Sequence, residues 1–450
     1  MISSLWSAVS GMNNTSTGLD VISNNISNMN TTGYKSNRAN FGDVLSQYVG
    51  NSGGQVGSGT QIMNISTLLT QGSLISTGNT YDMAIDGSGY FVTKDPSSGV
   101  TEYTRAGNFN VDQNGYLVTS SGMRVQGYMG TDVNATNSNT DNGILTSIRI
   151  QGNVSTAKPT STVTTGVNLN SQASVISAAF TLDRNGDGVN NDPGNYNYSN
   201  TTTVYDSQGG SHQVTAYFTK VADNSWQVHY AYPAHTSTSD TSSSPTLTMA
   251  TGTAQTLSFD SNGKLVSDGA SATSSVDPTT LFNFDSSVTV PQGIVFDYGT
   301  STNEGGTGLN GSTQVAENNQ MLNSSQDGYA AGSVKSVAIA DDGMITATLS
   351  NGQISTLGQI VLARFNDPTD LTKISGNFYE ASKSSGTAII NVAKSDGLGR
   401  VVSGSLESSN VDLSTEFVNM ITYQRAFEAN SKGIQTINEM LQTLNTLKQG

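Results

Sequence analysis

Both ends of the chain carry apolar residues at seven-residue intervals, separated by mostly polar positions. A repeat of this kind predicts a helix that packs along its seam against a partner helix. We therefore expect a terminal helical assembly domain, residues 1–30 with 412–450, in which two helices pair as in a coiled coil. Its candidate interface consists of Leu5, Met12, Leu19, Ile22 and Ile26 at one end, and of Leu413, Met420, Phe427, Ile434, Ile437, Leu441 and Leu444 at the other.

Some apolar residues of these predicted helices fall off the seam. Phe417, Val418 and Ile421 do so at one end, and Trp6 and Val9 at the other. A helix that is apolar on several sides must be covered on several sides. Self-assembly with other copies and an intramolecular bundle are both compatible with this pattern.

Between the helices the apolar positions alternate with polar ones, which is typical of β-strands. Short strands separated by Gly-, Asn- and Asp-containing turns run from 81 to 164 and again from 300 to 365. Asn114-Gly115, for example, joins two alternating runs and favours a tight hairpin. We expect these two segments to form a first β-domain together. Residues 31–80 with 366–411 would connect it to the helices.

Residues 165–299 predict a second β-domain inserted into the first. Its clearest element is a hairpin in which Val214, Ala216 and Phe218 share a face, as do Trp226 and Val228 on the next strand. The expected fold is multidomain and mainly β, with terminal α-helices and nested, discontinuous β-domains between them.

Composition narrows the function classes. The 450 residues carry a net charge of −15, and an acidic surface repels nucleic-acid phosphates. There is no Cys, which excludes disulfides and Cys-based metal sites. No apolar run approaches a membrane span, and the N-terminal stretch lacks the basic and apolar regions of a cleaved signal peptide. A Gly-, Ser-, Thr- and Asn-rich β-protein without Cys looks extracellular, so we expect export without such a signal.

Nothing in the sequence indicates catalysis. The three histidines, His212, His229 and His235, lie close in sequence. His229 falls on the polar face of its predicted strand, so a solvated residue is the expected reading rather than a metal or catalytic pair. No phosphate-binding loop, dinucleotide fingerprint or zinc-protease motif is present. We expect no catalytic residues, no cofactor and no enzymatic activity.

One segment has the spacing of a calcium loop. Asp183, Asn185 and Asp187 stand at alternate positions, Gly188 permits the sharp turn, and Asp192 offers a later carboxylate. Gly194 occupies the position where such loops carry a bidentate Glu. A weak calcium site and a polar surface turn therefore both remain open.

Several sequence blocks resemble the bacterial flagellar rod and hook protein family. At the N-terminal end they are Ser10-Gly11-Met12, 19–28 and Thr32-Gly33-Tyr34-Lys35. In the first β-domain they are Thr70-Gln71-Gly72, 82–91 and 103–109. At the C-terminal end they are 406–413, 417–421 and Gln424-Arg425. Together they cover both helical ends and much of the first β-domain.

The resemblance implies a structural subunit, and the large insertion favours the hook over the shorter distal rod subunit. It implies a flexible tubular polymer that transmits torque from rod to filament in the hook and basal body, outside the cell. Implied partners are copies of the chain, the distal rod, hook cap and hook–filament junction proteins, and the flagellar type III export apparatus; no nucleic acid or membrane insertion is implied. Alternatives are a distal rod or hook-associated protein, or a secreted β-rich adhesin or glycan-active enzyme.

Overall fold

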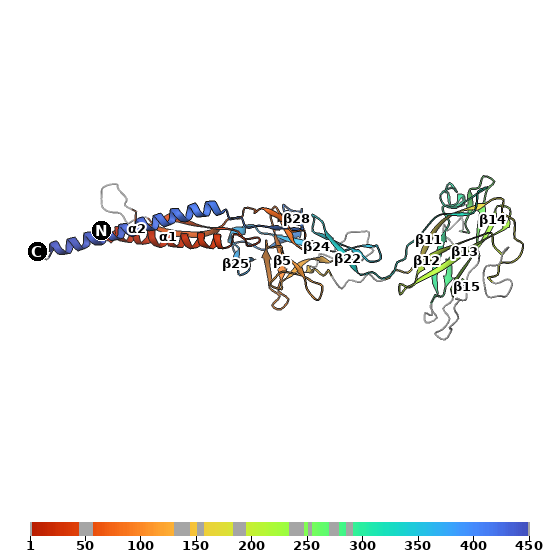
Figure 1. The fold of residues 1–450 in the computed structure, drawn as a ribbon, viewed down its shortest axis with the longest axis horizontal. Coiled ribbons are helices and arrows are strands. Elements are labelled where there is room, and N and C mark those ends of the chain that lie inside the picture. The colour runs from red at the N-terminus through yellow and green to blue at the C-terminus, as the bar shows by residue number, and fades with distance from the viewer. Residues whose placement is uncertain are drawn as a thin grey trace. The chain divides into compact units, whose positions relative to one another are not determined.

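The chain folds into two compact units, which we examined in a computed structural model (Figure 1). Unit 1 comprises Met1–Asn153, Val334–Leu349 and Ile354–Gly450, and unit 2 comprises Val154–Ser333 and Ser350–Gln353. The predicted class, mainly β with a helix at each end, is confirmed. The structure describes residues 2–44, 57–129, 145–150, 157–182, 195–233, 247–250, 254–269, 279–284 and 291–448.

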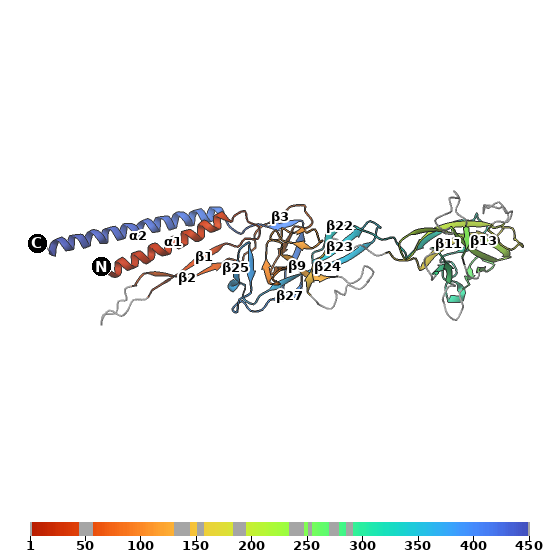
Figure 2. The same cartoon turned by 90° about the horizontal axis from the view of Figure 1, so that it is seen from below.

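The terminal helices lie side by side within unit 1. Helix α1 spans Ile2–Ser27 and α2 spans Leu413–Lys448, and they run antiparallel (Figures 1 and 2). Asp412 caps α2, since its Oδ1 accepts a hydrogen bond of 3.0 Å from the Thr415 N–H. This satisfies one of the backbone donors that a helix leaves unpaired in its first turn.

A two-stranded hairpin packs against α1, in a region that we expected to be part of a connector. Strand β1 (Asn37–Asp43) pairs antiparallel with β2 (Thr60–Thr67). Asn14 Nδ2 donates to Thr60 Oγ1 at 2.8 Å, and the Thr60 N–H donates to Ser10 Oγ at 3.3 Å. These polar bonds cover one side of α1, which leaves fewer of its faces open.

The β-part of unit 1 is built on an antiparallel sheet. Along its main path the order is β22 (Val334–Ile339), β23 (Met344–Leu349), β24 (Ile354–Arg364), β9 (Arg124–Met129), β5 (Tyr90–Lys94), β6 (Thr101–Thr104), β26 (Phe378–Glu380) and β25 (Thr372–Ile374). Strands that pair at its sides are β7 (Asn110–Val111), β8 (Leu117–Val118), β10 (Thr146–Ser147) and β27 (Ile389–Val392). A short 3-10 helix, η2 (Pro368–Asp370), follows β24. Strands from both halves of the chain thus share one sheet.

Two further strand pairs join the C-terminal segment to the early β-strands. Strand β28 (Arg400–Ser403) pairs with β4 (Met83–Asp86), and β29 (Ser405–Glu407) pairs with β3 (Leu74–Ser76). The core beneath includes Phe91 and Phe109, whose ring centroids are 5.1 Å apart in an edge-on arrangement. These pairings hold the segment that leads into α2 against the early β-strands.

Unit 2 contains two sheets. One has the order β18 (Thr279–Phe282), β19 (Gln292–Asp297), β11 (Thr162–Asn170), β20 (Thr313–Val315), with β21 (Gln320–Gln326) also paired to β11. The other has the order β12 (Tyr198–Tyr205), β13 (Ser211–Ala222), β14 (Ser225–Pro233), β16 (Gln255–Phe259), β17 (Leu265–Ser267), with β15 (Leu247–Met249) paired to β14. A 3-10 helix, η1 (Thr302–Glu304), precedes β20. The hairpin predicted around Phe218 and Trp226 is confirmed as β13 and β14.

The C-terminal boundary of unit 2 differs from the division that we expected. We placed residues 300–365 in the first β-domain, yet β20 and β21 hydrogen-bond to β11 of unit 2. Strand β11 pairs in parallel with β20 and antiparallel with β21, so both strands belong to the same sheet as β11. Pairing between strands some 150 residues apart cannot be read from local alternation.

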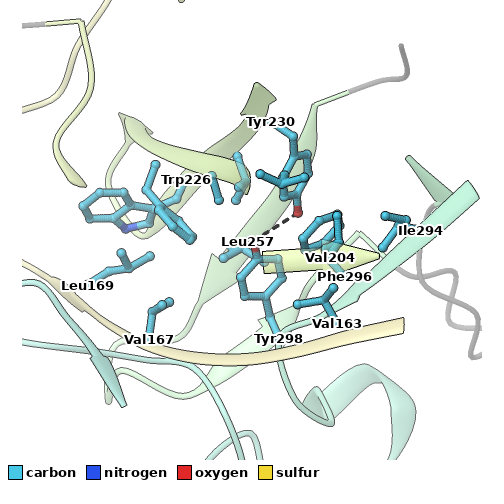
Figure 3. Packing of buried hydrophobic residues seen from close by; sticks show 14 of the residues in the cluster. Val163, Val167, Leu169, Val204, Trp226, Tyr230, Leu257, Ile294, Phe296 and Tyr298 are labelled. Atoms are coloured by element: carbon cyan, nitrogen blue, oxygen red, sulfur yellow. Dashed lines mark hydrogen bonds between the residues drawn. The ribbon is translucent and has the colours of Figure 1, made fainter. Parts of the chain in front are cut away.

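The core of unit 2 is aromatic and carries a small number of buried polar bonds (Figure 3). Trp226 Nε1 donates to Gln314 Oε1 at 2.9 Å, and the hydroxyl oxygens of Tyr230 and Tyr298 lie 3.0 Å apart. Tyr230 also stacks on Phe296, with centroids 4.1 Å apart. Burial raises the pKa of Tyr298 well above its ordinary value, so its hydroxyl stays neutral and remains a donor.

Asp327 ties the end of β21 to the start of β11. Its Oδ1 accepts from the Ser161 N–H at 2.8 Å and the Thr162 N–H at 3.0 Å, and its Oδ2 lies 3.1 Å from Lys158 Nζ. Partial burial alone would raise the pKa of Asp327, but these bonds and the Ser161 hydroxyl lower it to about 2. A depressed carboxyl pKa stabilises the fold above the unfolded-state value and loses that contribution as pH falls through the folded-state value.

We expect Asp327→Asn to destabilise unit 2 at pH 5 by about 1 kcal/mol, after allowance for solvent screening of this partly exposed group. The difference from wild type should shrink as pH falls from 5 to 2, because the wild-type carboxylate then becomes protonated. Denaturant unfolding of both chains at the two pH values measures this. Glu317→Gln, at an exposed carboxylate of the same unit, is the control. An Asp327→Asn effect that is equal at both pH values would contradict the assignment.

Candidate assembly surface and its buried joint

The two helices meet along a line of three residue pairs. A Cβ atom placed on Gly11 would lie 2.9 Å from Asn430 Nδ2, and one placed on Gly18 would lie 3.3 Å from the Tyr423 ring. One heptad further, Asn25 Nδ2 donates to Glu416 Oε1 at 3.0 Å. Gly11, Gly18 and Asn25 therefore face Asn430, Tyr423 and Glu416 in turn. The absence of a side chain at the two glycines lets the helices approach closely.

On α2 most of the predicted seam residues stand three or four positions from Glu416, Tyr423 or Asn430, which places them beside the contact line. Leu413, Met420, Ile434, Ile437 and Leu441 are half-buried, and Phe427 is 36% exposed. They flank the Glu416–Tyr423–Asn430 line at heptad spacing. The side chain of Leu444 lies outside the described residues.

On α1 the predicted stripe is rotated from the contact line. Each residue of this stripe comes one position after Gly11, Gly18, Asn25 or the position seven residues before Gly11. One position is about 100° around a helix. The residues of the stripe are Leu5, Met12, Leu19 and Ile26. They are half-buried, whereas Ile22 is only 4% exposed. The contact residues Gly11, Gly18 and Asn25 were missed because they are not apolar. Their seven-residue spacing was the signal that could have identified them.

We expect substitutions at Gly18 to depend steeply on side-chain size. Gly18→Ala gains about 1 kcal/mol of helix propensity, which offsets the small shift that Tyr423 must make. Gly18→Leu forces the helices apart and costs about 1–3 kcal/mol. Amide exchange of α1 in the full chain measures both. Equal protection in the two variants would show that the helices do not depend on this close approach.

Large apolar side chains of the helix pair remain exposed in the single chain. Trp6 is 67% exposed and Val418 is 64% exposed, and Phe417, Ile421 and Met440 are each about half exposed. On the hairpin, Met63 and Ile65 are exposed as well. We call Phe417, Val418 and Ile421 the outer face of α2. An apolar face of this kind marks a surface for contact with another molecule.

A network of polar side chains attaches the helix pair to the β-part of unit 1. Asn25 is buried, and its Oδ1 accepts from the Asn37 N–H at 2.9 Å. The Tyr34 hydroxyl donates to Asn24 Oδ1 at 2.8 Å. Partial burial raises the pKa of Glu416, the carboxylate that accepts from Asn25. Satisfied buried networks specify one geometry, so these residues hold α1, β1 and α2 in register.

Asn410 makes a second connection, between the segments that flank the helices. Its Oδ1 accepts from the Ser36 N–H at 2.8 Å, and its Nδ2 donates to the carbonyl oxygens of Leu68 at 2.9 Å and Thr70 at 3.1 Å. One amide side chain therefore links the chain before β1, the chain after β2 and the chain before α2.

Glu407 is the centre of a buried group of charges, which we call the buried joint. Its Oε1 lies 2.6 Å from Lys35 Nζ, and its Oε2 lies 3.3 Å from Arg105 Nη1. The Gly72 N–H donates to the same Oε1 at 3.0 Å. Glu407 is fully buried, and Lys35 is 2% exposed. Burial lowers the pKa of Lys35, while its bond to Glu407 acts in the opposite direction.

Two glycines make room for the buried joint. Gly33 has φ +68°, and a Cβ atom there would lie 2.7 Å from the Arg105 carbonyl carbon. A Cβ atom on Gly72 would lie 2.0 Å from the Ser408 oxygen. Only glycine fits either place, which explains why both lie in the sequence blocks described above.

Two of the three histidines contact neighbouring side chains, and the other candidate residues lie outside the residues that the structure describes. His212 Nε2 is 2.7 Å from Asp206 Oδ2, and burial lowers the pKa of His229, which stacks on Phe180. His235 and the calcium candidates Asp183, Asn185, Asp187 and Asp192 lie outside the described residues. Within the described ranges, no group of three or more His, Asp or Glu side chains is placed to hold a metal.

Length and apolar content decide whether a helix can span a membrane. In the part of the chain that the structure describes, neither helix is long and apolar enough to cross a membrane.

Four family models match parts of this chain, and all four describe flagellar rod, hook or basal-body proteins. They are Flagella basal body rod protein at residues 5–35, Flagellar hook protein FlgE/F/G D1 domain at 84–172, Flagellar basal body protein FlaE D2 domain at 168–329, and Flagellar basal body rod FlgEFG protein C-terminal at 402–447.

Whole-chain relatives identify the family more narrowly. Flagellar hook protein FlgE of Salmonella typhimurium is 36% identical, with 98% of this chain and 99% of the relative covered. The FlgE proteins of Treponema pallidum and Borreliella burgdorferi are 36% and 32% identical, with both chains covered completely. The chain belongs to the flagellar hook protein FlgE family, a family of structural rather than catalytic proteins. A crystal structure of Helicobacter pylori FlgE2 matches 74% of this chain and 100% of its own at 17% identity, with a TM-score of 0.48.

Proposed function

We propose that copies of this chain assemble into a flexible tubular polymer, the flagellar hook, that carries torque from the rod to the filament. The observation that carries this proposal is the outer face of α2, where Phe417, Val418 and Ile421 remain exposed. Burial of this face against another copy would remove apolar area from water. Family membership over the full chain supports the hook over a shorter rod subunit.

The helix pair would form the inner part of the tube. The seam residues of α2 stabilise the pair within one chain, while the outer face of α2 and the half-buried Leu5, Met12 and Leu19 of α1 contact neighbouring copies. A contact between two different surfaces does not close on itself, so it propagates into a helical filament. The seam residues thus act in assembly by presenting the pair as a single stiff unit.

The β-parts would form the outer layers. Their surfaces are rich in Ser, Thr and Asn, which exchange hydrogen bonds with water at small net free-energy cost. Contacts of this kind can shift between arrangements of similar energy while the tube bends. The division into assembly domain, connector, first β-domain and inserted β-domain stays a proposal within this scheme, with residues 300–333 assigned to the inserted β-domain.

Membership of the family supports our proposal for the remaining partners. We place the subunit in the hook and basal body, in contact with the distal rod, hook cap and hook–filament junction proteins. Export would use the flagellar type III apparatus, without a cleaved signal peptide.

Electron microscopy of the purified full-length chain, after assembly at high concentration, tests the proposal. Curved or supercoiled tubes are the expected result. Straight, rigid tubes would favour a rod subunit, and the absence of any polymer would overturn self-assembly of this chain.

A further inference from the structure

Beside the buried joint, unit 1 has a pocket whose charge is opposite to that of the whole chain. The pocket has a volume of about 280 Å³ and is lined by Lys35, Tyr90, Arg105, Arg364, Phe365 and Pro368 among others. Three of its lining residues are cationic and none is a carboxylate. The chain as a whole has a net charge of −15, so this concentration of positive charge is local.

The positive charge in the pocket is only partly compensated. Glu407 pairs with Lys35 and Arg105, while Arg364 is exposed and makes no ion pair with any described residue. Three positive charges and one negative charge leave +2 over these four side chains. Lys35 and Arg105 are buried and share a single carboxylate, and excess buried charge of one sign is unfavourable unless a counter-ion reaches it.

Arg105 is a buried cation of the pocket. Only 8% of its side chain is exposed. Its guanidinium carbon lies over the Tyr90 ring, 5.4 Å from the ring centroid. Nη1 and Nη2 donate to Glu407 and to the Gly87 carbonyl oxygen. Nε is buried and has no hydrogen-bond partner among the described residues. Because Nε is closed to solvent, an anion in the pocket would be held by the charge of the guanidinium group and not by a bond to Nε.

We propose that this pocket is an oxyanion-binding site, which takes a phosphate-like anion or the carboxylate of a second copy. Guanidinium groups match both geometries through paired N–H donors. Arg364 is the last residue of β24, and its exposed side chain lines the pocket. Each copy carries 34 Asp and Glu residues, so an assembled neighbour is a ready source of a carboxylate.

The test uses full-length chain before assembly, with inorganic phosphate and acetate as separate calorimetric probes at constant ionic strength. We expect phosphate to bind in the millimolar range and acetate more weakly, because phosphate carries more charge. Arg364→Gln should weaken binding about tenfold or more. Lys383→Gln, which removes an exposed charge that is not part of the pocket, should change it less than about twofold.

Assembled polymer distinguishes the two sources of the anion. If a neighbouring carboxylate occupies the pocket, phosphate no longer binds after assembly; if the site takes free anions, phosphate binds as before. Either result is consistent with an oxyanion site. Failure of both probes to bind the unassembled wild-type chain would overturn it, as would equal weakening by Arg364→Gln and Lys383→Gln. The binding measurements on the unassembled chain do not involve the polymer, so they stand or fall separately from the proposed function.

Discussion

Replacement of Glu407 by Gln is expected to destabilise unit 1 by about 3–5 kcal/mol, because it leaves Lys35 and Arg105 buried without a counter-charge. Gln keeps the size of the side chain and one acceptor oxygen, so the loss reports charge rather than volume. Hydrogen exchange on the full chain measures it, since strands β3, β4 and β29 are followed separately from those of unit 2. Unit 2 should exchange as in wild type.

Asp86→Asn is the matched control for this experiment. Asp86 pairs with Arg400 at 2.9 Å in the same region, but both side chains are substantially exposed. Exposed ion pairs contribute about 0–1 kcal/mol. If Glu407→Gln costs no more than Asp86→Asn, the buried joint is not what holds the two ends of the chain together.

The double replacement Phe417→Asp and Ile421→Asp is expected to abolish polymer formation while the chain remains folded. Both residues are exposed in the single chain, so the monomer loses little. In the polymer each would forfeit burial worth about 1.5–3 kcal/mol. The critical concentration for assembly should therefore rise by about two to four orders of magnitude. Sedimentation and electron microscopy across a concentration series measure this rise.

Val100→Asp provides the comparison for the polymer experiment. Val100 is an exposed apolar residue next to β6, outside the helices, and its replacement should leave assembly unchanged. Helix content of the double variant should equal that of wild type. Assembly of the double variant at the wild-type critical concentration would show that the outer face of α2 is not an interface.

The helices illustrate what could be predicted from the sequence. On α2, the large apolar residues at heptad spacing stand beside the line of residues that contacts α1. On α1 the same rule pointed about 100° away, because Gly11 and Gly18 decide the contact through close approach of the backbones. Patterns of apolar residues describe burial by side chains and miss contacts made where side chains are absent.

Long-range polar contacts were outside the reach of local patterns. Nothing in the spacing of Lys35, Arg105 and Glu407 indicates that they meet, since the first and last are 372 residues apart. The resemblance to a family included these residues in its blocks without saying what they do. The hairpin β1–β2 was likewise read as part of a connector, because its strands are half polar and pack on a helix rather than in a sheet core.

Glu407 lies late in the chain and its two cationic partners lie early, so the buried joint cannot close during most of synthesis. Contacts between residues this distant form slowly, because the intervening chain must first be brought together. A chain that stops before residue 407 has Lys35 and Arg105 but no charge to bury with them. Such a chain also lacks α2, which begins at Leu413. The joint therefore closes only once the segment that leads into α2 is present, so closure of the joint and pairing of the two helices both wait for the last part of the chain.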